Sequence, residues 1–232
     1  RACPHRRADL SYGRLENGGL RCLYHGWLMG VDGRCLEQPG EPADSTYKDR
    51  IRHPAYPCRE AGSMIFAYLG EGKAPVLPMF DFMSASLDRY YVTKQFHACN
   101  YMQSLEGCCD PQHLTYLHRF SKDSSPDTLV TDLVATDVAP RLDLEETAYG
   151  IRIYSIRKIG GGEQYVRITN FVMPNCGAFA GEPLIDPRTG KRGIGYTVNW
   201  AVPIDDEHHY KYVAVYRDDG PIDTPYLADW FS

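Results

Sequence analysis

Cys3-Pro-His5 and Cys22-Leu-Tyr-His25 are the two short stretches that decide how this chain of 232 residues is organised. Each stretch offers one cysteine sulfur and one histidine imidazole, and 16 residues separate His5 from Cys22. Thiolate ligands suit iron–sulfur clusters and zinc, whereas imidazole suits iron, zinc and copper. The four side chains therefore predict a shared metal site near the start of the sequence.

Two kinds of metal site use two cysteines and two histidines. In structural zinc sites each loop usually carries one ligand type, as in C-x₂₋₄-C paired with H-x₃₋₅-H. In a Rieske [2Fe–2S] centre, two cysteines bind one iron and two histidines bind the other. Both loops here are mixed, which favours the Rieske cluster over zinc. Its predicted ligands are Cys3, His5, Cys22 and His25.

The sequence around these ligands resembles the large (alpha) subunit of Rieske non-haem iron aromatic ring-hydroxylating oxygenases. The two loops read C-P-H-R over residues 3–6 and C-L-Y-H-G-W over residues 22–27. Residues 10–14 and 18–22 are similar to the phthalate-dioxygenase-like branch. Two residues depart from the family pattern, because Arg7 replaces a common Gly and Leu23 replaces a frequent Pro.

A second motif lies at residues 100–118, which read N-Y-M-Q-S-L-E-G-C-C-D-P-Q-H-L-T-Y-L-H. It resembles the mononuclear iron motif of the same oxygenases, which implies that His113 and His118 bind Fe(II). Two imidazoles and one carboxylate form a facial triad that leaves positions open for O₂ and substrate. Five residues turn an ideal helix by about 140°, so both rings reach one metal only if the helix bends, ends or changes rotamers between them.

Asp110 has two interpretations. Before Pro111 it is a good helix N-cap, with proline at the first helical position. The resemblance instead implies that Asp110 hydrogen-bonds a metal histidine and reaches a cluster histidine of a neighbouring subunit, connecting His25 to His113. The motif favours this bridging role. Glu106, one turn upstream, is either an outer partner of the iron site or an ordinary helix carboxylate.

Composition excludes some functions. The net charge is −5 and no basic run is interleaved with aromatics, which argues against nucleic-acid binding. No apolar run reaches about 18 residues, so no membrane span is expected. The eight cysteines lack the spacing of a disulfide framework, which indicates a reducing cytoplasm. Because the chain opens two residues before a cluster ligand, we expect a fragment lacking both termini.

The expected fold class is α+β. Residues 1–75 read as an all-β Rieske domain, with a hairpin at Asp32-Gly33. Proline-rich residues 74–78 place the domain boundary, and residues 76–232 form the second domain. The resemblance implies that this is a helix-grip catalytic domain with an antiparallel sheet. Alternation of apolar and polar residues predicts its strands at residues 149–154, 165–172, 195–203 and 209–217.

Other residues receive plainer predictions. Side chains expected in the core rather than a pocket are Tyr101, Met102, Leu105, Leu114 and Leu117. His53 and His97 are expected to be structural or exposed, whereas His208 and His209 are expected to lie on the surface. Residues 121–137 are expected to form a loop, either at the pocket mouth or on the surface. Candidates for binding an acidic substrate are Arg152, Arg157 and Arg167.

The resemblance implies an enzyme that uses O₂ to hydroxylate, by mono- or dioxygenation, or to demethylate an aromatic substrate, with an aromatic acid favoured. Electrons would come from NADH through a separate flavin and iron–sulfur reductase. A homotrimer is implied because the cluster and iron of one subunit are too far apart. The alternative is a Rieske ferredoxin-like electron carrier. No residue matches the third, carboxylate iron ligand; Asp205, Asp206, Asp223 and Asp229 lack the family's context.

Overall fold

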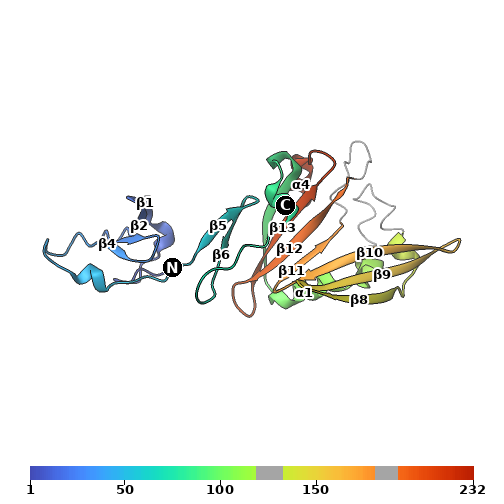
Figure 1. The fold of residues 1–232 in the computed structure, drawn as a ribbon, viewed down its shortest axis with the longest axis horizontal. Coiled ribbons are helices and arrows are strands. Elements are labelled where there is room, and N and C mark those ends of the chain that lie inside the picture. The colour runs from blue at the N-terminus through green and yellow to red at the C-terminus, as the bar shows by residue number, and fades with distance from the viewer. Residues whose placement is uncertain (119–132, 181–192) are drawn as a thin grey trace. The chain divides into compact units, whose positions relative to one another are not determined.

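The computed structural model describes residues 1–118, 133–180 and 193–232 (Figure 1). These residues form two compact units. The N-terminal unit comprises Arg1–Ala61 and Ile65–Pro78, and the C-terminal unit comprises Gly62–Met64 and Met79–Ser232. Most of the loop predicted at residues 121–137 lies outside the described residues, and residues 133–136 at its end are helical.

The N-terminal unit contains a four-stranded antiparallel sheet in the order β1-β2-β3-β4. Its strands are β1 (Arg14–Glu16), β2 (Gly19–Arg21), β3 (Leu28–Gly30) and β4 (Cys35–Glu37). A second pair joins β5 (Cys58–Ala61) to β6 (Met64–Ala67). Short 3-10 helices in the chain span Leu10–Tyr12, Tyr47–Arg50, Asp81–Ser84 and Leu87–Arg89.

The predicted hairpin at Asp32-Gly33 is confirmed. Gly33 joins β3 to β4 with φ +80°, a left-handed conformation that glycine adopts without steric cost. A Cβ at this position would lie 2.0 Å from the backbone oxygen of His53. Glycine is therefore required both by the turn and by the close approach of the neighbouring chain segment.

The C-terminal unit is built on a seven-stranded antiparallel sheet in the order β7-β13-β12-β11-β10-β9-β8. Its strands are β7 (Tyr90–His97), β8 (Arg141–Thr147), β9 (Gly150–Gly160), β10 (Glu163–Val172), β11 (Cys176–Phe179), β12 (Gly195–Pro203) and β13 (His209–Arg217). The bounds predicted for β12 and β13 are confirmed, because β-branched and aromatic residues alternate there with few interruptions.

The helices described in this unit include α1 (Tyr101–Cys109), α2 (His113–Tyr116) and α4 (Thr224–Trp230). The side chain of Asn100 caps α1 by accepting a hydrogen bond from the Met102 N–H at 2.9 Å. Helix α1 packs against strands β10 to β13, and Leu227 of α4 packs into a buried cluster with Val213 and Val215. The predicted α+β fold class is confirmed.

Candidate iron sites

The four predicted cluster ligands come together in the N-terminal unit. Cys3 is 1% exposed and Cys22 is 3% exposed, and neither forms a disulfide. The rings of His5 and His25 lie with their centroids 4.6 Å apart. Two soft sulfurs and two imidazoles are therefore gathered at one place, as a mixed cluster requires.

The two ligand loops share one turn geometry. In the first, the Arg7 N–H donates to the Cys3 carbonyl at 2.9 Å; in the second, the Gly26 N–H donates to the Cys22 carbonyl at 3.0 Å. Arg7 and Gly26 both have positive φ, at 60° and 76°. The residue four positions after each cysteine thus adopts the left-handed conformation, which explains why glycine is common at the position of Arg7.

One potential ligand atom at the cluster site lacks a hydrogen-bond partner within the described residues. Among the described residues, the buried Nδ1 atom of His5 has no hydrogen-bond partner. Burial lowers the pKa of His5, with the nearby His25 adding to the shift, and burial raises the pKa of the Cys3 thiol. A buried imidazole nitrogen without a partner beside two buried sulfurs fits a bound metal cluster, which would hold the cysteines as thiolates.

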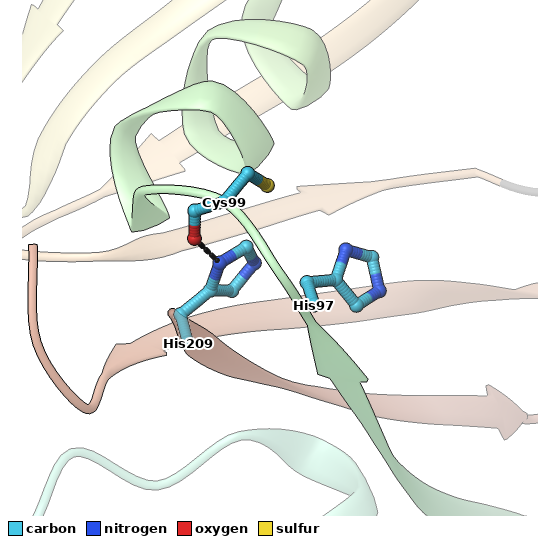
Figure 2. A group of neighbouring side chains, drawn as sticks. All are labelled: His97, Cys99 and His209. Carbon is cyan, nitrogen blue, oxygen red and sulfur yellow. Dashed lines mark hydrogen bonds between the residues drawn. The ribbon is translucent and has the colours of Figure 1, made fainter. Parts of the chain in front are cut away.

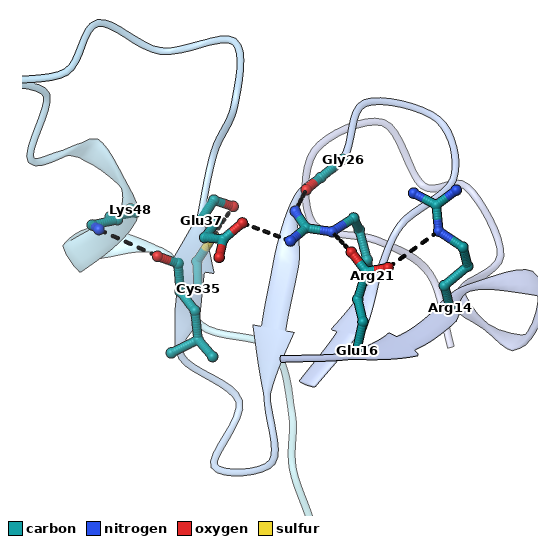
Figure 3. Close-up of polar contacts among 8 residues, drawn as sticks. Arg14, Glu16, Arg21, Gly26, Cys35, Glu37 and Lys48 are labelled. Carbon is teal, nitrogen blue, oxygen red and sulfur yellow. Dashed lines mark hydrogen bonds and ion pairs between the residues drawn. The ribbon is translucent and has the colours of Figure 1, made fainter. Parts of the chain in front are cut away.

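Two contacts support the loops from behind. The ring of Trp27, 5% exposed, stacks on His5 with centroids 4.5 Å apart and planes 6° apart. The guanidinium of Arg21 donates to the Gly26 carbonyl at 2.6 Å (Figure 3) and pairs with Glu37 at 2.6 Å and with Glu16. The first contact holds the His5 ring in place, and the second holds the backbone that follows His25.

The predicted mononuclear iron ligands also come together. Helix α2 begins at His113 and tightens into a 3-10 turn at Leu117 and His118. The rings of His113 and His118 have centroids 5.1 Å apart, with 59° between their planes. The end of the helix therefore brings together two rings that a continuous helix would point apart.

The donor chemistry of this pair fits a metal. The buried Nδ1 of His113 has no hydrogen-bond partner in the described part of the chain, and Asp110 Oδ2 lies 3.6 Å from it. Burial lowers the pKa of His118, and the neighbouring His113 lowers it further. This favours the neutral imidazole, which is the form that binds metals.

Asp110 caps the segment that carries the histidines. Its Oδ1 accepts from the Gln112 N–H at 2.7 Å and its Oδ2 accepts from the His113 N–H at 3.2 Å. These two hydrogen bonds are of the capping kind, but the N-cap position of α2 is Gln112, so Asp110 lies two residues before the predicted place and also ends α1. Its Oδ2 retains a lone pair toward the His113 ring, so the two roles are compatible. Glu106 is exposed and does not line the cavity described below.

Arg157 supports the same segment from the sheet. This residue is 0% exposed, and its Nη2 donates to the Pro111 carbonyl at 2.7 Å while its Nη1 donates to Ser155 Oγ at 2.5 Å. Arg157 was a candidate for substrate binding, but it does not line the cavity. It instead holds the backbone between Asp110 and His113.

A cavity of about 650 Å³ opens beside His113 and His118. Its polar lining comes mainly from neighbouring strands: Arg167 and Thr169 of β10, Thr197 and Asn199 of β12, and Lys211 of β13. Its apolar lining includes Leu114, Leu117, Val134, Phe179, Val213, Trp230 and Phe231. The prediction that Leu114 and Leu117 belong to the core is therefore wrong, whereas Leu105 is buried as expected.

The polar wall was missed from the sequence, apart from Arg167. A polar residue in a strand lies on a solvent face or on a cavity face, and alternation alone does not distinguish the two. What distinguishes a cavity face is a buried polar atom that has no hydrogen-bond partner. Within the described residues, Arg167 Nε, Thr197 Oγ1 and Asn199 Oδ1 are buried and have no hydrogen-bond partner.

The remaining predicted residues lie elsewhere. Arg152 pairs with Glu145 and does not line the cavity. His208 is partly exposed and pairs with Asp205 at 2.8 Å. His209 is 0% exposed, so its predicted surface position is wrong: β13 starts between β7 and β12 rather than at the sheet's edge. Within the described residues, the carboxylate lining the cavity is Asp110, and none of Asp205, Asp206, Asp223 and Asp229 reaches it.

Comparison with known proteins matches both parts of the chain to known families. Residues 1–56 match the Rieske [2Fe-2S] domain, and residues 67–230 match the family described as LigXa C-terminal domain like. The chain belongs to the alpha subunits of Rieske non-haem iron oxygenases. Members of this family carry a Rieske [2Fe–2S] cluster and a mononuclear iron, which confirms the predicted cofactors.

Curated relatives of this Rieske oxygenase chain are longer. It is 37% identical to the phthalate 4,5-dioxygenase oxygenase subunit of Pseudomonas putida, over 98% of this chain and 52% of the relative. It is 32% identical to the phenoxybenzoate dioxygenase subunit alpha of Ectopseudomonas oleovorans, over 91% of this chain and 53% of the relative. The chain thus spans about half the length of these relatives.

Solved structures share the fold of this Rieske oxygenase chain. Dicamba monooxygenase bound to dicamba aligns with a TM-score of 0.71 at 20% identity, covering 99% of this chain and 69% of that one. The terminal oxygenase of carbazole 1,9a-dioxygenase from Nocardioides aromaticivorans aligns with a TM-score of 0.67 at 18% identity, covering 99% and 66%. In the described residues, no helix is long and apolar enough to cross a lipid bilayer.

Proposed function

We propose that this chain carries the cluster and the iron-binding histidines of the oxygenase component of a Rieske system acting on an aromatic acid. Cys3, His5, Cys22 and His25 would hold the [2Fe–2S] cluster, and His113 and His118 would hold the mononuclear iron. Asp110 would position His113. Bound there, the iron supplies O₂ activation with electrons that arrive through the cluster. The domain limits proposed for these two parts are residues 1–75 and 76–232.

The observation that carries the proposal is the cavity beside His113 and His118. Leu114, Phe179 and Trp230 offer apolar surfaces to an aromatic ring and exclude water. Arg167 is 9% exposed, and its guanidinium carbon lies 5.5 Å from the centroid of the Phe179 ring. In a partly enclosed site, a planar guanidinium whose Nε has no hydrogen-bond partner among the described residues is suited to binding a carboxylate.

Lys211 adds a second cation to the same cavity, while Thr197 Oγ1 and Asn199 Oδ1 have no hydrogen-bond partner in the part of the chain that the structure describes. Burying unpaired polar groups costs free energy, which a polar substrate group would recover. The names of two relatives, phthalate 4,5-dioxygenase and 3-chlorobenzoate-3,4-dioxygenase, describe aromatic carboxylates. Both lines support an acidic aromatic substrate.

The partners belong to the same proposal. A flavin and iron–sulfur reductase would pass electrons from NADH, and a homotrimer would place each cluster near a neighbouring chain's iron. Solved complexes of the carbazole oxygenase with a ferredoxin provide an example of an electron-donor protein bound to this fold. The eight free cysteines support a reducing compartment, the cytoplasm. A match to the oxygenase-type domain over residues 67–230 counts against a pure ferredoxin-like carrier.

The test uses the whole protein with its cluster and iron loaded, its reductase, and a panel of aromatic acids and their methyl esters. Arg167→Met should raise KM for the acid tenfold or more and leave KM for the ester nearly unchanged. Arg152→Met is the matched control, because Arg152 lies on the adjacent strand β9 outside the cavity. Equal losses on acid and ester would remove Arg167 from carboxylate binding. A protein loaded with cluster and iron that oxidises none of the panel would reject the proposed function.

A further inference from the structure

A second group of potential metal-binding side chains contains none of the proposed iron ligands. His97 ends β7, Cys99 lies in the connection to α1, and His209 begins β13 (Figure 2). One potential ligand atom from each of these residues lies within 4.8 Å of the other two. His209 is fully buried, and His97 and Cys99 are partly buried. This group is separate from His113, His118 and the cluster ligands.

The sheet register brings the two histidines together. His97 and His209 are directly opposite each other in the β7–β13 ladder, so their side chains leave the same face. Their ring centroids are 4.9 Å apart, with 47° between the planes. Cys99 follows two residues after His97, where the chain turns toward α1, and its sulfur joins the pair. Two chain segments far apart in the sequence, residues 97–99 and the start of β13, thus meet at these side chains.

The hydrogen bonding of His209 selects the tautomer that binds metals. Its Nδ1 lies 2.8 Å from the Cys99 carbonyl oxygen, which can only accept, so Nδ1 carries the proton. The lone pair is then on Nε2, which accepts from the Ser104 hydroxyl at 2.7 Å. Metal-ligating histidines typically donate their other N–H to a carbonyl or carboxylate in this way. A metal would take the place of the Ser104 hydroxyl at Nε2.

We propose that His97, Cys99 and His209 form a zinc site, with a water molecule or the Ser104 hydroxyl as fourth ligand. Imidazole and thiolate ligands each suit zinc, which binds four ligands in a tetrahedron. Zinc–ligand bonds of about 2.0–2.3 Å put neighbouring ligand atoms of a tetrahedron roughly 3.4–3.6 Å apart. Side-chain rotations that move the ligand atoms by about 1 Å would bring the present group to that geometry. The bound zinc would tie β7 and β13 to the start of α1, the helix that leads to Asp110.

The experiment measures zinc bound per chain in the whole protein with cluster and iron loaded. Cys99→Ser and His97→Ala remove one ligand each and avoid the fully buried His209. Cys58→Ser and His208→Ala are the controls, because Cys58 is exposed, His208 is partly exposed and pairs with Asp205, and both lie outside the group. The protein is alkylated with and without zinc, and peptide mapping then measures the labelling of each cysteine. Circular dichroism checks that each variant is folded.

We expect one zinc per chain in the wild type and controls, and at least tenfold weaker binding in Cys99→Ser and His97→Ala. Zinc should protect Cys99 from alkylation and leave Cys58 unprotected. Equal zinc binding in the wild type and all four variants would overturn the proposal. Zinc would then bind outside this group, for example in place of iron at His113 and His118. Equal labelling of Cys99 with and without zinc would overturn it as well.

Discussion

At the scale of single residues, Arg7 is the clearest case of a strained position beside a proposed ligand. Its φ of 60° is the left-handed conformation, which costs a non-glycine residue about 1–2 kcal/mol, and Gly26 occupies the equivalent position in the other loop. Arg7→Gly should stabilise the N-terminal unit by about 0.5–1 kcal/mol, after subtracting the entropy that glycine gains on unfolding. The measurement is the urea concentration at which the cluster's visible circular dichroism is lost.

Arg6→Gly provides the comparison for this prediction, because Arg6 is also exposed but its φ is not positive. It should lower the midpoint by a similar amount, since glycine there only adds freedom to the unfolded chain. A midpoint that falls in both variants would show that the Arg7 side chain stabilises the loop more than its backbone conformation costs.

The proposed ligand residues were readable from the sequence because their chemistry and spacing are local. His5, His25, His113 and His118 each lie within a few residues of another motif member, and the structure brings each pair together. His209 was misplaced because its burial depends on β7, more than a hundred residues earlier in the chain. Nothing in the local sequence of β13 reports that neighbour.

At the scale of elements, Arg157 of β9 links the sheet to the segment that precedes α2. Hydrogen bonds from charged donors contribute about 1.5–3 kcal/mol each, and Arg157 makes one to Pro111 and one to Ser155. Arg157→Met should destabilise the C-terminal unit by about 2–3 kcal/mol and lower the iron content at His113 and His118 several-fold. Metal analysis beside the cluster's absorption distinguishes this loss from general unfolding.

The control for Arg157 is Arg141→Met, which removes an exposed arginine paired with Asp143 on the neighbouring strand β8. Iron content and stability should both stay near the wild type. If Arg157→Met lowered stability while iron stayed fully bound, Arg157 would serve the sheet alone and not the metal segment.

Element boundaries divide into predictable and unpredictable ones for a physical reason. The bounds of β12 and β13 follow from dense β-branched and aromatic residues, and the turn after β9 follows from three consecutive glycines. The cavity wall did not follow, because Thr197, Asn199 and Lys211 look like ordinary solvent-face residues in the sequence. Their common face is decided by how the sheet curves around the helices.

At the scale of the whole molecule, the proposed trimer makes a quantitative prediction about mixed assemblies. Cys22→Ser should abolish the cluster while keeping His113 and His118, and His113→Ala should abolish iron binding while keeping the cluster ligands. Each variant alone should be inactive. In a head-to-tail ring assembled at random from equal amounts of both, about one quarter of the interfaces join an intact cluster to an intact iron site.

Co-expressed variants should therefore recover about one quarter of the wild-type rate if electrons cross between subunits through Asp110. The measurement is substrate oxidation by the purified mixed assembly with its reductase, with metal analysis confirming half occupancy of each site. Adding Asp110→Asn to the Cys22→Ser chain should remove this recovery, because that chain supplies the intact His113. Transfer within one chain would instead leave the mixture as inactive as its components, since no single chain then holds both metals.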